Sequence, residues 1–257
     1  MQINDQNRFT QAAAAGGTRA RSQAEIDQGL RAFMLGVYNN MVLGLAITGV
    51  VALGTYMLAT TTAPDGSLAL TSFGAAVYTS PLRWVLMLSP LAFIFFFSFK
   101  IESLQPRTAL MMFLAFSGLM GISMSSIFLV FTGQSIVQVF FITAAAFGSL
   151  SLYGYTTTRS LSGMGTFLFM GLIGLIIAMV VNIFLASSAL AFAVSVIGVL
   201  IFAGLTAWDT QRLKEMYLFN NYDSATAAKV SVMGALSLYL NFINMFQFLL
   251  ALMGDRE

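Results

Sequence analysis

The chain has 257 residues, of which 58% are hydrophobic and 9% are charged, and its formal net charge is +2. Because soluble domains carry about 25% charged residues, this composition indicates an integral membrane protein, and so small a net charge gives no indication of nucleic-acid binding. The sequence contains no cysteine and no histidine, which excludes disulfides, thiolate catalysis and the histidines that most often shuttle protons or bind metals.

The amino-terminal 32 residues are polar and of low complexity, as in QAAAAGGTRARSQ. Such a composition is typical of disordered segments, so we interpret residues 1–32 as a disordered cytoplasmic tail. We find no signal peptide, because the first apolar segment is too long for one and no small-residue cleavage site follows it. The membrane domain is expected to occupy residues 33–254.

Seven apolar segments follow the tail, and a helix needs about 20 such residues to cross the hydrocarbon layer. Strands of a membrane barrel would be about half as long and would alternate in polarity. We therefore expect an all-α integral membrane protein with seven transmembrane helices, the second of them kinked at Pro90. The predicted spans are 33–58, 83–99, 108–131, 136–156, 165–186, 189–211 and 229–253.

The cationic residues are distributed unevenly between the two sides of these spans. Only Arg83 and Arg256 fall on one side. The positive-inside rule then predicts a cytoplasmic amino terminus and, with seven spans, a carboxyl terminus outside. The ten cations on the other side are Arg8, Arg19, Arg21, Arg31, Lys100, Arg107, Arg159, Arg212, Lys214 and Lys229.

Glycines recur along the predicted spans, and we interpret them as sites where helices pack closely. They are Gly44, Gly49, Gly54, Gly118, Gly121, Gly171, Gly174, Gly198 and Gly204.

The stretch GLTAWDTQRLKEMY places Asp209 at the end of a long apolar run, three residues before Arg212. No other acid lies plausibly within a span, and charge inside the bilayer is costly. One interpretation is an interfacial aspartate paired with Arg212 or Lys214 one turn on. The other is an inward-facing carboxylate that lines a polar cavity and responds to pH, because burial disfavours its charged form.

The last span carries a polar stripe in ALSLYLNFINMFQFLL. Spacings of four, three and three residues put Ser237, Asn241, Asn244 and Gln247 on one helix face, which we expect to point into the bundle. Hydrogen bonding between helices and lining of a pore are both compatible with this stripe. Further buried amides, which could join the same network, are expected at Asn39, Asn40 and Asn182.

Asp209 and Asn241 are each 16 residues from position 225, in the polar turn NNYDSATA. Residues equidistant from the turn of an antiparallel helical hairpin lie at similar depth, so we expect these two side chains to face each other.

These motifs resemble the Bax inhibitor-1 family, also called the transmembrane Bax inhibitor motif family. GLTAWDTQRLKEMY is similar to its sixth-helix signature and LSLYLNFINMF to its seventh. WVLMLSPLAFIFFFSF, GISMSSIFLVFTGQSI and FFITAAAFGSLSLYGYTTTRSLSGMG resemble bacterial members across helices two to five, and RAFMLGVYNNMVLGLAITG resembles their first helix. The resemblance covers about residues 30–254.

The resemblance implies six helices around a central seventh, a bacterial inner-membrane location and, for some members, a pH-sensitive calcium leak. In that mechanism two aspartates, one in each signature, share protons to set the gate. Asp209 matches the first, with Thr210, Gln211 and Arg212 beside it as supporting polar residues, but Asn241 stands at the second. We expect the Asp209–Asn241 pair to stay assembled with a weakened or shifted pH response, since an amide cannot titrate with a carboxylate.

Calcium prefers six to eight oxygen ligands with several carboxylates among them, so we expect transient contact of Ca²⁺ with Asp209 and no tightly bound metal or other cofactor. The chain is not expected to be an enzyme, because no histidine is present to pair with a serine and a two-aspartate site lacks its second acid. A retinal protein is excluded by the absence of lysine between Val230 and Gly254.

The alternative function is a non-conducting regulator or substrate of a membrane-bound AAA protease, as the resemblance implies for some bacterial members. The amino-terminal tail would then be the segment by which the protease binds the chain.

Overall fold

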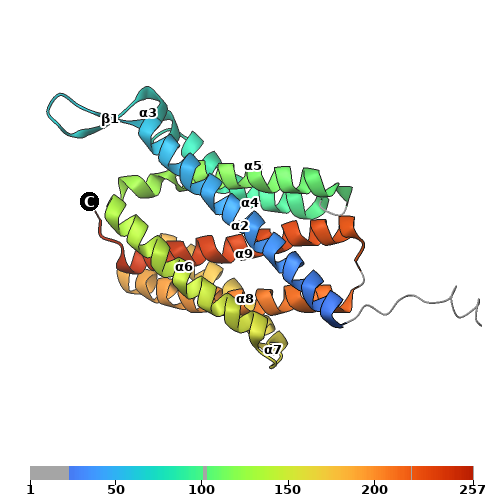
Figure 1. Ribbon diagram of the computed structural model, residues 1–257. Helices are drawn as coiled ribbons and strands as arrows, with labels where there is room; N and C mark the ends of the chain where they lie inside the picture. Colours follow the sequence, from blue (N-terminus) through green and yellow to red (C-terminus); the bar gives the residue numbers. More distant parts are fainter. Residues whose placement is uncertain (1–22, 101–102, 221, 257) are drawn as a thin grey trace, which may run out of the picture.

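The computed structural model describes residues 23–100, 103–220 and 222–256, and these form a bundle of long helices with one short β-hairpin at its end (Figure 1). Residues 1–22, most of the predicted tail, lie outside the described residues. The elements are α2 (Gln23–Ala59), β1 (Thr60–Thr62), β2 (Leu68–Leu70), α3 (Ser72–Tyr78), α4 (Leu82–Lys100), α5 (Pro106–Met124), the 3₁₀ helix η2 (Ser125–Leu129), α6 (Gly133–Thr156), α7 (Ser162–Leu185), α8 (Ser188–Phe219) and α9 (Ser224–Met253).

Helices α2 and α8 extend furthest beyond their predicted spans. Helix α2 begins at Gln23, ten residues before 33, so the predicted end of the tail falls inside a helix. Leu30 and Phe33 continue its apolar face and are buried, which explains the early start. Helix α8 runs to Phe219, past the predicted end at 211, because good helix formers follow and Leu213 is buried.

Six helices in the described part of the chain are long and apolar enough to cross a membrane. The second predicted span corresponds to α4, which matches its predicted bounds closely and runs on through Pro90. The bend in this region measures 58° and lies between α3 and α4, ahead of the proline. A seventh span exists if the bent pair α3–α4 counts as one, so the predicted number of seven stays a prediction.

The hairpin β1–β2 was not expected from the sequence. It pairs Thr60 with Leu70 and Thr62 with Leu68 in antiparallel register. Gly66 in its loop has φ = 85°, a left-handed conformation that glycine adopts without strain. The hairpin returns the chain to the end of α2, where the α3 residue Gly74 lies directly against the carbonyl of Ala59.

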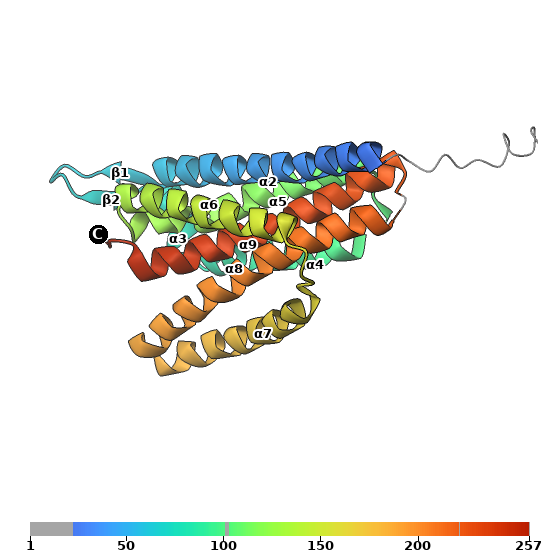
Figure 2. The ribbon, with the colours of Figure 1, turned by 60° about the horizontal axis from the view of Figure 1, so that its bottom comes forward.

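Helix α9 occupies the centre of the bundle and packs against α2, α5, α6 and α8. It is the most buried span, with 44% of its most apolar stretch enclosed by protein, whereas the corresponding share for α7 is 6%. Helix α4 packs mainly on α5, and α7 packs mainly on α8. Figure 2 shows α7 at one side of the bundle, at the bottom of the view. The central last helix is therefore present, with four close neighbours and two outlying helices.

The core between α2, α5 and α9 is built around Tyr239, which is fully buried. Its ring lies edge-on to Phe113 and Phe116, with centroids 5.6 and 5.8 Å away, and its hydroxyl hydrogen-bonds to Thr48 Oγ1 over 2.7 Å. Thr48 Oγ1 also donates to the carbonyl of Ser117 at 2.9 Å. This polar contact gives the central helix a fixed register against its neighbours.

The predicted role of the glycines is right for some positions and wrong for others. An added Cβ at Gly44 or Gly121 would collide with α5 or α2 across their interface, and one at Gly198 would meet Phe248. No heavy atom lies within 4 Å of an added Cβ at the exposed or half-buried glycines Gly49, Gly54, Gly118 and Gly174. Those four positions do not serve close helix packing.

Helices α8 and α9 form an antiparallel hairpin. Asp223 caps α9 by accepting a hydrogen bond from the backbone N–H of Thr226 at 3.3 Å, and the contact with Thr226 lowers the pKa of this exposed carboxyl. Three contacts between the two helices locate the turn of this hairpin, because the sequence midpoint of each contacting pair falls at residue 223 or 224. The pairs are Leu213 and Gly234, Asp209 and Ser237, and Gly198 and Phe248. The predicted centre at 225 is thus within one helical turn of the observed one.

Candidate functional site

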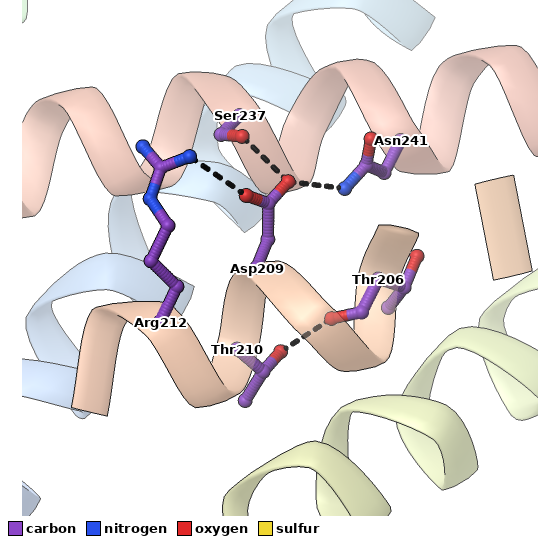
Figure 3. Close-up of polar contacts among 6 residues, drawn as sticks. All are labelled: Thr206, Asp209, Thr210, Arg212, Ser237 and Asn241. Carbon is purple, nitrogen blue, oxygen red and sulfur yellow. Dashed lines mark hydrogen bonds and ion pairs between the residues drawn. The ribbon is translucent and has the colours of Figure 1, made fainter. Parts of the chain in front are cut away.

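Asp209 lies inside the bundle at the α8–α9 interface, and 5% of its surface is exposed. Ser237 Oγ donates a hydrogen bond to its Oδ2 at 2.7 Å, and Asn241 Nδ2 donates to the same oxygen at 2.8 Å (Figure 3). Asn241 is equally buried. The predicted proximity of Asp209 and Asn241 is therefore confirmed, and Ser237, one turn nearer the hairpin, completes the contact between the two helices.

The other carboxylate oxygen of Asp209 faces Arg212. Arg212 Nη1 is 3.6 Å from Oδ1, and its side chain is 49% exposed. The guanidinium also lies over the ring of Trp208, 5.1 Å from the centroid, a cation–π arrangement. The carboxylate of Asp209 therefore combines the geometry of both sequence interpretations, because it is buried in the bundle and is also paired with Arg212. Its response to pH stays a prediction.

Lys214, the other cation considered for Asp209, is bound elsewhere. Its Nζ donates to the backbone carbonyl of Tyr155 at 2.8 Å, near the end of α6. A cation at the carboxyl end of a helix offsets the partial negative charge of the last carbonyl groups. Lys214 therefore holds α6 against α8 rather than neutralising Asp209.

A cavity of about 1170 Å³ adjoins the Asp209 group, between α4, α5, α7, α8 and α9. Every residue of the predicted polar stripe lines it: Ser237, Asn241, Asn244 and Gln247. On α9 the lining runs from Ser237 to Ala251, roughly 21 Å at 1.5 Å per residue. The stripe thus faces a single hollow, with Asp209 and Arg212 at one end.

The members of the stripe differ in their contacts. Asn244 is half-buried and donates to the carbonyl of Leu240 in its own helix at 2.7 Å, and Gln247 is exposed. Only Ser237 and Asn241 reach across to α8. The stripe therefore combines interhelical hydrogen bonding at one end with a polar cavity wall at the other.

Thr210 and Gln211 lie next to Asp209 in sequence but point away from its carboxylate. Thr210 Oγ1 donates to the carbonyl of Thr206 at 2.8 Å (Figure 3). Gln211 Oε1 accepts from the N–H of Leu161 at 2.7 Å, while its Nε2 donates to the carbonyl of Arg159 at 2.8 Å. Gln211 fixes the loop between α6 and α7, so the expectation that it supports the aspartate directly does not match its contacts.

A second chain of hydroxyl groups leads away from α8. Ser151 Oγ is 3.0 Å from Thr210 Oγ1, and Tyr38 OH is 2.5 Å from Ser151 Oγ. This chain joins α2, α6 and α8 and was missed in the sequence. Serine and threonine are common in membrane helices, so their spacing alone does not indicate which of them meet.

The additional amides do not join the Asp209 group. Asn39 is exposed and Asn40 half-buried, so the expectation of two buried amides in the first span is wrong. Asn182 lines the same cavity as Asp209, but its Oδ1 accepts from the backbone N–H of Ser187 at 3.0 Å and so closes the end of α7.

These features define the chain as a multi-pass α-helical membrane protein with a buried acid–amide contact at the centre of its bundle. A family model described as "Inhibitor of apoptosis-promoting Bax1" matches residues 30–257. The chain belongs to this family, the Bax inhibitor-1 family.

Several bacterial relatives are similar over nearly their full lengths. A protein of Caulobacter vibrioides is 45% identical over 98% of this chain and 99% of its own length. RP147 of Rickettsia prowazekii is 45% identical over 93% of this chain and 96% of its own. The inner membrane protein YbhL of Escherichia coli is 41% identical, with coverages of 93% and 98%.

Proposed function

We propose that this chain is a pH-modulated cation leak channel of the bacterial inner membrane, with Ca²⁺ as a permeant ion. The observation that carries the proposal is the buried Asp209 carboxylate at one end of a cavity whose α9 wall is lined by Ser237, Asn241, Asn244 and Gln247. Polar side chains inside a membrane bundle are costly unless they serve packing or a pathway. Two of these four, Asn244 and Gln247, make no hydrogen bond to another helix in the described part of the chain.

Arg212 is the element that we assign to gating. Held 3.6 Å from Oδ1, its guanidinium places a positive charge at the Asp209 end of the cavity, where it opposes entry of a cation. Protonation of Asp209 removes the charge that retains Arg212, and the half-exposed side chain then moves toward solvent. Acidification would therefore increase cation flux, with the helix contact through Oδ2 still in place.

The location and orientation are part of the same proposal. The inner membrane is favoured by the name of the Escherichia coli relative, and the cytoplasmic amino terminus by the excess of Lys and Arg on one side of the spans. With seven spans the carboxyl terminus faces the periplasm. The Arg212 end of the cavity would then open toward the cytoplasm.

The test is Ca²⁺ flux through the purified protein in liposomes that enclose a calcium indicator, measured between pH 5 and pH 8. We expect flux above that of protein-free liposomes, rising as the pH falls, and a flat pH profile for Asp209→Asn. The matched control is Thr143→Val on α6, which removes a buried hydroxyl bonded only to its own helix and should leave the profile unchanged.

Absence of flux at every pH would contradict the channel. The alternative, a regulator or substrate of a membrane-bound AAA protease, predicts a copurifying protease and loss of that association when residues 1–22 are deleted. A flux that persists unchanged in Asp209→Asn would retain conduction but remove Asp209 as the pH-sensitive group.

A further inference from the structure

A second hollow, separate from the Asp209 cavity, lies on the surface of the bundle between α2 and α6. It measures about 860 Å³ and is almost entirely apolar, with Phe242 of α9 among its lining residues. On α2 the lining extends from Arg31 to Val50, roughly 28 Å of helix, which is close to the thickness of the hydrocarbon layer of a membrane. We call it the α2–α6 groove; in Figure 1 the two helices run in a similar direction and both cross α9.

Two glycines keep this groove open. Gly49 of α2 and Gly148 of α6 both line it, both are exposed, and an added Cβ at either position has no heavy atom within 4 Å. Glycine lowers helix stability by roughly 1 kcal/mol relative to alanine, and helix packing gives no reason for it at these two positions. A larger side chain at either position would extend into the groove.

The groove is amphipathic along its length because its polar groups lie toward one end. Arg31 lines that end, is exposed and makes no ion pair with the residues that the structure describes. Tyr155 lines the same end from α6, and Lys214 Nζ lies 5.5 Å from the centroid of its ring. Arg31 thus places a positive charge where the apolar groove meets the end of the bundle, and Lys214 lies behind Tyr155, outside the groove lining.

The dimensions favour a lipid chain over a protein helix. A methylene is close in size to a water molecule, which takes roughly 30 Å³ in the liquid, so a chain of sixteen carbons needs on the order of 500 Å³. A helix of the same length as the groove, about 10 Å wide, would need on the order of 2000 Å³. The volume of the groove, about 860 Å³, is closer to the first estimate than to the second.

We infer that the α2–α6 groove binds one anionic phospholipid, with an acyl chain between the two helices and the phosphate on Arg31. The guanidinium is suited to phosphate because it offers paired N–H donors in one plane. The inference is independent of ion conduction. Hydroxyl groups nevertheless connect the proposed lipid site with the interior of the bundle. Tyr38 and Ser151 line the groove, and Ser151 contacts Thr210, the neighbour of Asp209.

The experiment is native mass spectrometry of the detergent-purified protein titrated with phosphatidylglycerol or with phosphatidylcholine of the same chains. We expect one tightly held phosphatidylglycerol per chain and weaker retention of phosphatidylcholine. Arg31→Gln should weaken phosphatidylglycerol binding about fivefold, the contribution of one cation near an anionic headgroup, and leave phosphatidylcholine binding unchanged.

A pair of double variants separates the groove from general effects on the helices. Gly49→Phe with Gly148→Phe fills the groove and should abolish the lipid adduct. Gly54→Phe with Gly174→Phe introduces the same rings at two glycines that also have open surroundings but do not line the groove, and should retain it. Adducts that survive in the first pair, or equal retention of both lipids by the unmodified protein, would overturn the proposal. So would a dimer that the first pair converts to a monomer, because a second copy would then occupy the groove.

Discussion

Asn241 donates its amide N–H to Asp209 Oδ2 over 2.8 Å, across a helical hairpin in which 32 positions separate the two residues. The contact joins the central helix of the bundle to the helix that carries the acid. Both residues are 5% exposed, so water competes little for their polar groups. Each hydrogen bond therefore stabilises the packing of α8 on α9 more than it would at the protein surface.

Asn241→Asp should turn this contact into a carboxylate pair. Two carboxylates at hydrogen-bond distance cannot easily be ionised together, so they share a proton and titrate as a coupled pair. We expect the interface itself to become pH-dependent, with a flux profile that is steeper and displaced from that of the unmodified protein. Liposome flux against pH is the measurement, and superimposable profiles would be the contrary result.

Arg212→Gln should raise cation flux severalfold at neutral pH and flatten its dependence on pH. The substitution removes the positive charge 3.6 Å from Asp209 Oδ1, which we assign to the closed state. Arg212→Lys is the matched control, since it keeps the charge and should preserve the response. If neutral-pH flux were the same in all three proteins, Arg212 would have no part in gating.

Ser237→Ala and Ser231→Ala should have opposite effects on stability, although both remove a hydroxyl from α9. Ser237 donates to Asp209, and interhelical hydrogen bonds in membranes contribute roughly 0.6–2 kcal/mol. Ser231 Oγ is buried with no hydrogen-bond partner in the described structure, so its removal should be neutral or stabilising by up to about 1 kcal/mol. The measurement is the midpoint of thermal unfolding of each variant in detergent. A lower midpoint for Ser231→Ala than for Ser237→Ala would contradict the prediction.

Gly154→Ala should destabilise the bundle by about 1–3 kcal/mol, the usual effect of overpacking. Its added Cβ would collide with the backbone carbonyl of Ala207, which cannot move without shifting α8. Gly148→Ala, two turns earlier on the same helix, has open space and should be neutral or slightly stabilising. Equal melting temperatures for the two variants would contradict the packing of α6 on α8.

Gln211→Ala should loosen the loop between α6 and α7 without changing the pH profile of flux. The side chain holds this loop through Leu161 and Arg159 and does not contact Asp209. We expect faster hydrogen exchange or proteolysis at residues 157–161. If the variant showed unaltered hydrogen exchange in the loop but an altered pH dependence of flux, Gln211 would have to act on Asp209 rather than on the loop.

Much of this architecture could be predicted because burial in a membrane leaves a strong imprint on composition. Each predicted span corresponds to a helix of the structure. The contact between Asp209 and Asn241 followed from the geometry of the helical hairpin, whose centre was misplaced by less than one turn. The ends of α2 and α8 could not be placed by hydropathy, since both helices continue into polar sequence held by Leu30 and Leu213. Hydropathy indicates which residues are suited to lipid. Where a helix ends beyond the lipid depends instead on how its polar extension packs against the protein.

The side-chain network was harder to predict than the spans. Gln211 and Asp209 are two residues apart, yet they face different partners because successive helical positions are rotated by about 100°. The open surroundings of Gly49 and Gly148 depend on how far apart α2 and α6 lie, and a glycine in a groove looks the same in sequence as one in a tight crossing. The contact of Tyr38 with Ser151 depends on that same separation.

The two oxygens of Asp209 have different neighbours. Oδ2 accepts hydrogen bonds from Ser237 and Asn241 on the central helix, and Oδ1 faces Arg212, whose side chain is half-exposed. One carboxyl group therefore links the central helix to a side chain that reaches the surface of the bundle, so that replacing this single residue would break both connections at once.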